Sequence, residues 1–183
     1  QPDGAAASFR RALEIKPDFA KAHSNLIFTL DLAAGANIST LQQERSRWDA
    51  VHAAPLAAMH RPHANRRDPE RRLRIGYVSA DFRTHSAASV FGAMLVKFDP
   101  ARFEVFAYCN STTEDSHTRL FQQGVSRWRK IVGRSDEAVA ELIRQDEIDI
   151  LVDLSGHSAG NRLLVFARKP APIQVTYIGY QNT

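Results

Sequence analysis

The fold is decided by IDILVDL, residues 148–154, a short run too apolar for a strand with one face in water. Similar β-branched or aromatic runs occur elsewhere in the chain: LRIGYVS at 73–79, FEVFAY at 103–108, a weaker run at 128–132 and IQVTYI at 173–178. Stretches with helical spacing of apolar residues separate them: 86–97, 115–124, 135–147 and 160–168. This alternation predicts an α/β fold with a Rossmann-like, doubly wound parallel sheet.

The preceding residues, 1–58, carry a helical pattern instead. Small, aromatic, small and proline residues follow one another at the spacing of a tetratricopeptide unit: Ala5, Phe9, Ala12 and Pro17. An ordinary helical hairpin is the alternative interpretation. A further helix over residues 39–54 is expected to cap the array. Because stacked repeats need about three units to bury a continuous core, we expect further repeats upstream.

The charge of the chain is concentrated in one stretch. The 183 residues carry a net charge of +4, and HRPHANRRDPERRLR, residues 60–74, holds six arginines against two acidic residues, which accounts for the whole excess. We interpret residues 59–72 as a basic linker between the helical segment and a lobe spanning 73–183. A nucleic-acid-binding arm is the alternative, but no aromatic residue is interleaved for base stacking, so no nucleic-acid partner is expected.

Two further properties bound the location of the protein. No apolar run approaches the roughly 18–20 residues of a membrane span, so we expect no membrane partner. The single cysteine, Cys109, excludes an internal disulfide and fits a reducing, cytoplasmic compartment.

Ligands of doubly wound sheets bind beyond the carboxyl ends of the strands. Four predicted loops share that edge: residues 80–86, 109–117, 155–162 and 179–183. The first three each contain a histidine, namely His85, His117 and His157. We interpret His117, which lies among polar residues, as simply solvated. The backbone N–H groups that open the helix after residue 160, together with Arg162, form a natural anion site.

Known motifs exclude some functions and leave one alternative open. Neither GxGxxG nor GxxxxGK[ST] follows the first strand, which disfavours dinucleotide-binding and P-loop proteins. His60 and His63 have the spacing of metal ligands, but they lie in the arginine-rich linker without a thiolate or paired carboxylate, so no metal site is expected. GHSAG, residues 156–160, fits the nucleophile elbow of a serine hydrolase with Ser158 as nucleophile. No Asp, Glu or His follows Ser158, so that triad would be incomplete within the chain.

Read together, three blocks and the helical segment before them resemble one family. The blocks are LRIGYVSADFRTHS, FEVFAY and IDILVDLSGHSAGNRLLVFARKPAPIQVTYIGYQNT. They are similar to the protein O-linked N-acetylglucosamine transferases and their SPINDLY-like relatives of glycosyltransferase family 41, over essentially the whole chain. The resemblance implies tetratricopeptide repeats leading into a two-lobed GT-B enzyme. This chain would hold the last repeats and the N-terminal catalytic lobe, without the donor-binding lobe.

The resemblance also implies an activity. Such enzymes move N-acetylglucosamine from UDP-GlcNAc to Ser or Thr hydroxyls of proteins, with inversion and without a metal or another cofactor. The partners expected are a nucleotide sugar and an acceptor protein bound by the repeats, and the chain alone is expected to be inactive. An interaction module with an inactive lobe is the alternative, with the serine hydrolase third.

Specific residues follow from the same resemblance. His85 corresponds to the family histidine at the mouth of the active site, proposed as a base or as a contact to the sugar donor. Six residues are expected to bind substrate: Asp81, His157, Asn161, Arg162, Tyr180 and Thr183. The chain departs from the animal enzymes at Ser86, where they have Pro, and in GYQNT, where they have GYPGT, which indicates a bacterial-type member. Glu141 lies near the position of an Asp proposed there for proton handling.

Overall fold

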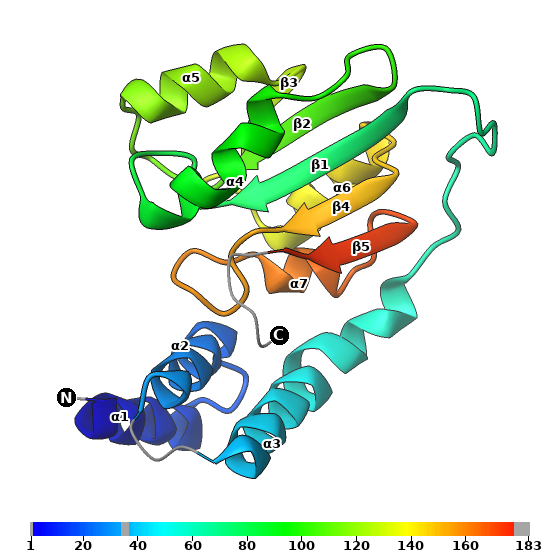
Figure 1. Ribbon diagram of the computed structural model, residues 1–183. Helices are drawn as coiled ribbons and strands as arrows, with labels where there is room; N and C mark the ends of the chain where they lie inside the picture. The colour runs from blue at the N-terminus through cyan, green and yellow to red at the C-terminus, as the bar shows by residue number, and fades with distance from the viewer. Residues whose placement is uncertain (1, 34–36, 178–183) are drawn as a thin grey trace.

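The computed structural model, which describes residues 2–33 and 37–177, is built around a parallel five-stranded sheet (Figure 1). The strand order is β3-β2-β1-β4-β5. The strands are β1 (Leu73–Ser79), β2 (Phe103–Cys109), β3 (Arg127–Lys130), β4 (Ile150–Asp153) and β5 (Ile173–Thr176). The order reverses at β1, from which the chain runs first to one side and later, at β4, to the other. The predicted Rossmann-like, doubly wound α/β fold is therefore confirmed.

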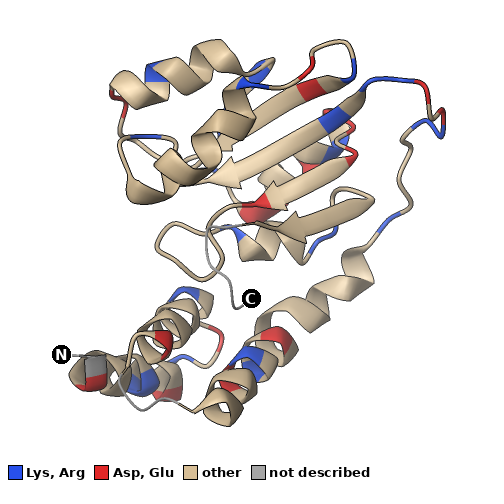
Figure 2. Ribbon diagram, viewed as in Figure 1, with Lys and Arg blue, Asp and Glu red and all other residues tan. Residues whose placement is uncertain are grey.

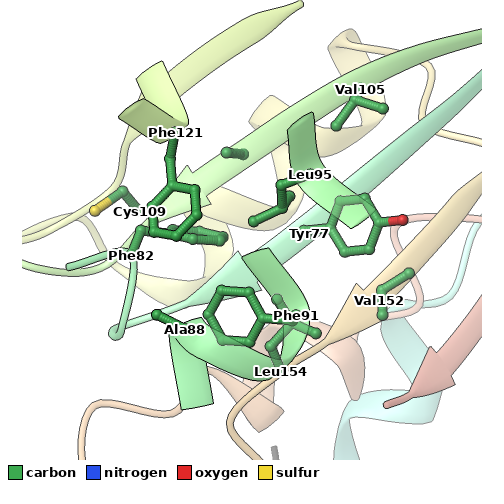
Figure 3. Close-up of a cluster of buried hydrophobic side chains, with 11 residues drawn as sticks. Tyr77, Phe82, Ala88, Phe91, Leu95, Val105, Cys109, Phe121, Val152 and Leu154 are labelled. Carbon is green, nitrogen blue, oxygen red and sulfur yellow. The ribbon is translucent and has the colours of Figure 1, made fainter. Parts of the chain in front are cut away.

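Helices cover both faces of the sheet, as the apolar strands require. They are α4 (Ser86–Val96), α5 (Ser116–Gly124), α6 (Asp136–Gln145) and α7 (Leu163–Phe166). On β2, Val105 and Ala107 pack toward α4 and α5, whereas Phe106 and Tyr108 pack toward α6 and α7, because successive side chains of a strand point to opposite faces. Figure 3 shows the first of these two cores, with Phe82 among the α4 and α5 side chains.

The helix ends are set by capping side chains and by positive-φ residues. Ser135 accepts a hydrogen bond from the backbone N–H of Ala138, so α6 begins where its sequence predicts. Glu147 has φ of 50°, which no helix interior accommodates, and α6 ends at Gln145. The last helix, expected over 160–168, is only the single turn of α7, because Gly160 (φ 79°) and Lys169 (φ 45°) limit it on both sides.

The N-terminal part forms a helical segment of residues 2–33 and 37–59. It comprises α1 (Pro2–Ile15), α2 (Ala20–Asp31) and α3 (Ile38–Trp48). Small and aliphatic side chains join α1 to α2: Ala6, Leu13, Ala22, Leu26 and Leu30. The helix expected over 39–54 is shorter, since after Trp48 it widens into a π-helical turn and then tightens into a 3₁₀ helix, Ala54–Met59, with Pro55 in its first turn. The tetratricopeptide interpretation of this segment stays a prediction.

The linker, residues 60–72, runs along the lobe from the helical segment to the start of β1 (Figure 2). Arg61 pairs with Glu141 of α6. Arg71 donates to both oxygens of the buried Asp149, at 2.5 and 2.6 Å. Burial would raise the pKa of Asp149, but hydrogen bonds from Arg71, the Arg74 backbone and Asn65 hold that pKa below its usual value. Lobe carboxylates thus neutralise part of the positive charge of this stretch.

Within the described ranges, no helix has both the length and the apolar character needed to cross a membrane.

Candidate active site

A cleft of about 510 Å³ opens beyond the carboxyl ends of β1 and β4, where α2 faces the lobe. Its lining comes from α2, from the loop after β1 with the start of α4, and from the loop after β4. The residues are Phe28, Asp81, Arg83, His85, Ser86, Ala87, Val90, Leu154, Ser158 and Ala159. The cleft therefore lies at the switch point where doubly wound sheets bind ligands.

The loop after β1 brings three charged or titratable side chains to this cleft. Asp81 is mostly buried and accepts a hydrogen bond from Arg83 Nη2 at 3.2 Å. The same carboxylate oxygen lies 3.8 Å from Nε2 of His85. The backbone N–H of Asp81 donates to Ser79 Oγ at 2.9 Å, which fixes the carboxylate relative to the end of β1. The cleft wall thus holds a compact Asp–Arg–His group.

His85 is held by the helix that follows it. It is the N-cap residue of α4, with extended backbone angles of −156° and 150°. Its Nδ1 accepts a hydrogen bond from the backbone N–H of Ala87 at 3.2 Å. The first N–H groups of a helix have no partner within the helix, so the imidazole satisfies one of them. The ring is oriented by this bond, and its side chain remains 36% exposed.

Two further anchors make the loop after β1 rigid. The side chain of Phe82 is completely buried in the core beneath α4 and α5 (Figure 3). Thr84 donates its backbone N–H to Asp115, the cap of α5, and its hydroxyl lies 2.9 Å from His117 Nδ1. Backbone hydrogen bonds from Thr84 and Thr118 hold the pKa of Asp115 far below its usual value. Phe82 and Thr84 therefore fix the loop that presents Asp81, Arg83 and His85.

The loop after β4 forms the opposite wall, and Asp153 organises it. This carboxylate is almost fully buried and accepts the backbone N–H groups of Ser155 (3.1 Å) and Gly156 (2.8 Å). Burial raises the pKa of Asp153 despite those hydrogen bonds. Gly160 adopts φ of 79°, and a Cβ there would lie 2.7 Å from the Cβ of Ala80. Only glycine lets the two loops approach this closely.

His157, in the same loop, points into the contact with the helical segment. Its Nδ1 lies 3.1 Å from Ser24 Oγ of α2, and its ring packs edge-on against Trp48 of α3 with centroids 5.2 Å apart. Burial, with smaller contributions from the charges of Arg45 and His23, lowers the pKa of His157 to about 4. His157 is thus a neutral residue of the interface at ordinary pH.

Arg162 lies beside a second, smaller hollow of about 290 Å³, between α2 and the loop after β4. Its guanidinium donates to four protein oxygens: Asp136 Oδ1, Asn110 Oδ1 and the carbonyls of Ile131 and Arg134. Asn161 lines the same hollow, and its side chain donates to the carbonyl of Ser158. Arg162 therefore ties the loop after β4 to the loops after β2 and β3.

A family model supplies the decisive comparison. The model of glycosyl transferase family 41 matches residues 21–183, which includes all of α2 except its first residue, and α3, the linker and the whole lobe. The chain belongs to glycosyl transferase family 41. The expected family is therefore confirmed.

Relatives within family 41 agree over nearly the whole chain. SPINDLY from Petunia hybrida is 35% identical over 175 residues, which cover 93% of this chain and 19% of the relative. The UDP-N-acetylglucosamine–peptide N-acetylglucosaminyltransferase of Caenorhabditis elegans is 32% identical over 174 residues, 88% of this chain and 14% of the relative. A solved mutant O-GlcNAc transferase from Thermobaculum terrenum superposes with a TM-score of 0.90 at 36% identity, over 98% of this chain and 34% of its own. The chain thus spans about a fifth or less of these curated relatives.

In this family 41 lobe, the residues expected at the site lie in three places. Asp81 and His85 share the large cleft, whereas Asn161 and Arg162 line the smaller hollow. His157 is buried against the helical segment. Tyr180 and Thr183 lie outside the described residues. Glu141 is exposed on α6 and pairs with the linker, away from the lining of the large cleft.

Among the cleft residues that were not expected at the site, Arg83 carries the one charged side chain and Phe28 the one aromatic ring of the described lining. Arg83 could have been found from its place between Asp81 and His85, since every residue of that loop lies at the carboxyl edge of the sheet. Phe28 carries no such signal, because an aromatic residue in a helix is usually part of a core.

The geometry does not support the serine hydrolase. A nucleophile elbow places the serine at a sharp turn between a strand and a helix. Here β4 ends at Asp153 and α7 begins at Leu163, so Ser158 lies in the middle of a longer loop.

Across residues 2–33 and 37–177, no three or more His, Cys, Asp or Glu side chains are grouped so that they could hold a metal ion.

Proposed function

We propose that this chain is the N-terminal catalytic lobe, with adjoining repeat helices, of an enzyme that transfers N-acetylglucosamine from UDP-GlcNAc to Ser or Thr hydroxyls of proteins. The similarity to the transferases of Caenorhabditis elegans and Thermobaculum terrenum supports the reaction class. The observation that carries the proposal is the position of the Asp81–Arg83–His85 group at the carboxyl edge of the sheet, inside a cleft that α2 also lines.

The chemistry suits such a cleft. In an inverting transfer, the acceptor oxygen attacks the anomeric carbon, the bond to the UDP oxygen breaks with its electron pair leaving on UDP, and a base in the site takes the proton of the acceptor hydroxyl. Negative charge develops on the departing diphosphate, and a fixed guanidinium such as that of Arg83 lowers the energy of that charge without a metal. The acceptor protein enters along α2, which is consistent with repeats that guide it.

The buried thiol of Cys109 suits a reducing, cytoplasmic compartment.

The proposed enzyme needs a second lobe to bind most of the nucleotide. We therefore expect the 183-residue chain to transfer no sugar by itself and the complete protein to do so. The test incubates each with UDP-GlcNAc and a Ser/Thr peptide library and detects modified peptides by mass spectrometry. In the complete protein, the substitution His85→Asn is expected to abolish most of the sugar-transfer activity.

Two outcomes would overturn the proposal. Sugar transfer by the isolated chain would show that no second lobe is required. A complete protein that neither transfers sugar nor binds UDP-GlcNAc by calorimetry would instead favour an interaction module with an inactive lobe.

A further inference from the structure

We propose that a hollow between the linker and α6 binds a phosphate group, held between Arg144 of α6 and His63 of the linker. The hollow has a volume of about 260 Å³ and is walled by residues 61–65, by three residues of α6 and by Pro170, which precedes β5. It shares no lining residue with the large cleft. The site is therefore separate from the proposed sugar transfer and does not depend on it.

Arg144 carries a half-buried guanidinium that has no carboxylate partner within residues 2–33 and 37–177. Its Nη2 donates to the backbone carbonyls of Arg168 and Lys169, both at 2.9 Å, which fixes the group at the wall of the hollow. In the same part of the chain, its Nε and Nη1 donate to no protein atom. The carboxylate of Glu141 lines the hollow as well, but it pairs with Arg61. Arg144 thus brings unused donors and an unmatched charge to the hollow.

The surroundings of both side chains carry an excess of positive charge. Burial lowers the pKa of Arg144, and the charge of Arg61 lowers it further, against a smaller opposite effect of Glu141. Burial likewise lowers the pKa of His63, and the charges of Arg144 and Lys169 add to that effect. An anion bound between the two bases would counteract these effects, because an opposite charge favours the protonated forms.

His63 supplies the second binding group, from the linker. Its ring is half-buried and makes no hydrogen bond within the described ranges, so it has an N–H to donate without losing a protein partner. The linker is held in place at the nearby His60, whose Nε2 lies 2.8 Å from the carbonyl oxygen of Ala167. His63 and Arg144 therefore line one hollow from two separate elements, both of which are fastened to the lobe.

The donors favour a phosphate group over a carboxylate. Arginine is the side chain of choice for phosphate recognition, through charge-assisted hydrogen bonds. A tetrahedral phosphate presents oxygens in several directions and so accepts from α6 and from the linker at once, whereas a carboxylate presents two oxygens in one plane. Its charge of nearly −2 at neutral pH also suits the surplus of basic groups. A phosphate bound here would join the linker to α6.

Equilibrium dialysis with ³²P-labelled inorganic phosphate tests the site in the complete protein, at pH 7.5 and constant ionic strength. We expect saturable binding by the parent protein. Arg144→Gln should weaken it by about tenfold or more, the usual effect of losing a hydrogen bond to a charged group. His63→Leu should have a similar effect, and its ring has no protein hydrogen bond to lose if Arg144→Gln fails to fold. No saturable binding by the parent, or unchanged affinity in either folded variant, would overturn the proposal.

Two control variants locate the bound phosphate. Arg119→Gln removes the same charge from an exposed position on α5, which packs on the opposite face of the sheet from α6, and should bind phosphate like the parent. An equal loss in this control would mean only a general attraction of anions to a basic protein. Arg83→Gln removes the guanidinium of the large cleft and should also leave phosphate binding unchanged. A loss there would place the phosphate in the cleft and contradict the proposal.

Competition identifies the source of the phosphate group. Displacement of the label by glycerol 3-phosphate as well as by inorganic phosphate shows that the hollow accepts the group as part of a larger molecule. Displacement by inorganic phosphate alone shows that it admits the free anion. Acetate that competes as well as phosphate at the same ionic strength would count against the site. Because none of these measurements detects sugar transfer, a failure of the proposed function leaves their result unchanged.

Discussion

Ser24 of α2 and His157 of the loop after β4 lie 3.1 Å apart, Oγ to Nδ1, and join the helical segment to the lobe. Trp48 of α3 closes over the imidazole, and all three side chains are buried. The loop that forms one wall of the cleft is therefore held from the helical side as well as from the sheet. This contact couples the position of α2, another wall of the cleft, to the lobe.

Acid should weaken this contact. The pKa of His157 is about 4 in the folded protein, because burial disfavours the charged ring, against about 6.5 in an unfolded chain. Between these values the unfolded state binds more protons, so the free energy of unfolding is fully present above pH 6.5 and falls as the pH drops toward 4. This difference in pKa corresponds to at most about 3.4 kcal/mol of unfolding free energy. Burial also lowers the pKa of His23 and of His52, so these two residues also make the free energy of unfolding fall as the pH drops.

Urea unfolding at several pH values between 7.5 and 4.5 measures this effect. His157→Asn removes the titrating ring and keeps a polar partner for Ser24, so its unfolding free energy should depend less steeply on pH. His117→Asn, at an exposed histidine, is the matched control and should keep the parent slope. Identical slopes for all three proteins would show that His157 does not contribute.

Gly160 should resist substitution for two reasons that can be separated. Its φ of 79° strains any other residue, and a Cβ would lie 2.7 Å from that of Ala80. Gly133 has nearly the same φ, 77°, but a Cβ there would meet nothing within 4 Å. Gly133→Ala should therefore cost only the backbone strain, about 1 kcal/mol, and Gly160→Ala about 2–3 kcal/mol. Chemical denaturation compares the two, and equal losses would mean that the loops separate without cost.

The sequence predicts the lobe well because strands buried on both faces leave nearly continuous apolar runs. The run at 73–79 matches β1 residue for residue, and 103–108 falls one residue short of β2. The prediction is least accurate near the loop after β4. There Gly160 combines a positive φ with a close approach to Ala80, a tertiary contact that no local sequence pattern records.

The candidate site could likewise be predicted from the sequence only in part. The cleft position of Asp81 and His85 follows from topology, since parallel strands deliver their following loops to one edge. The burial of His157 could not be predicted, because its partner Ser24 is 133 residues away in the chain. Arg162 has the residue type of an anion site, but the carbonyls and carboxylate around its guanidinium become visible only in the folded chain.

The pairing of Arg71 with Asp149 should stabilise the junction of linker and lobe. Asp149 is buried, so Arg71→Ala would leave a carboxylate with two remaining partners, Asn65 and the backbone of Arg74. We expect a loss of about 2–4 kcal/mol in unfolding free energy at pH 7. Arg66→Ala is the matched control, since Arg66 pairs with Asp68 at the exposed surface and should cost less than about 0.5 kcal/mol. Equal, small losses would show that the linker is not fastened here.

Arg162 was expected to bind substrate, but its contacts indicate that it stabilises the folded lobe, and a substitution can distinguish the two roles. A lysine at this position keeps the positive charge but cannot donate to four separated oxygens, because only the planar guanidinium presents that many donors in fixed directions. Arg162→Lys should therefore lower the unfolding free energy by about 2–3 kcal/mol. In the complete protein, the affinity for UDP should change little at a temperature where the variant is fully folded, as calorimetry can measure. A variant that unfolds like the parent protein but binds UDP much more weakly would show instead that Arg162 contacts the ligand.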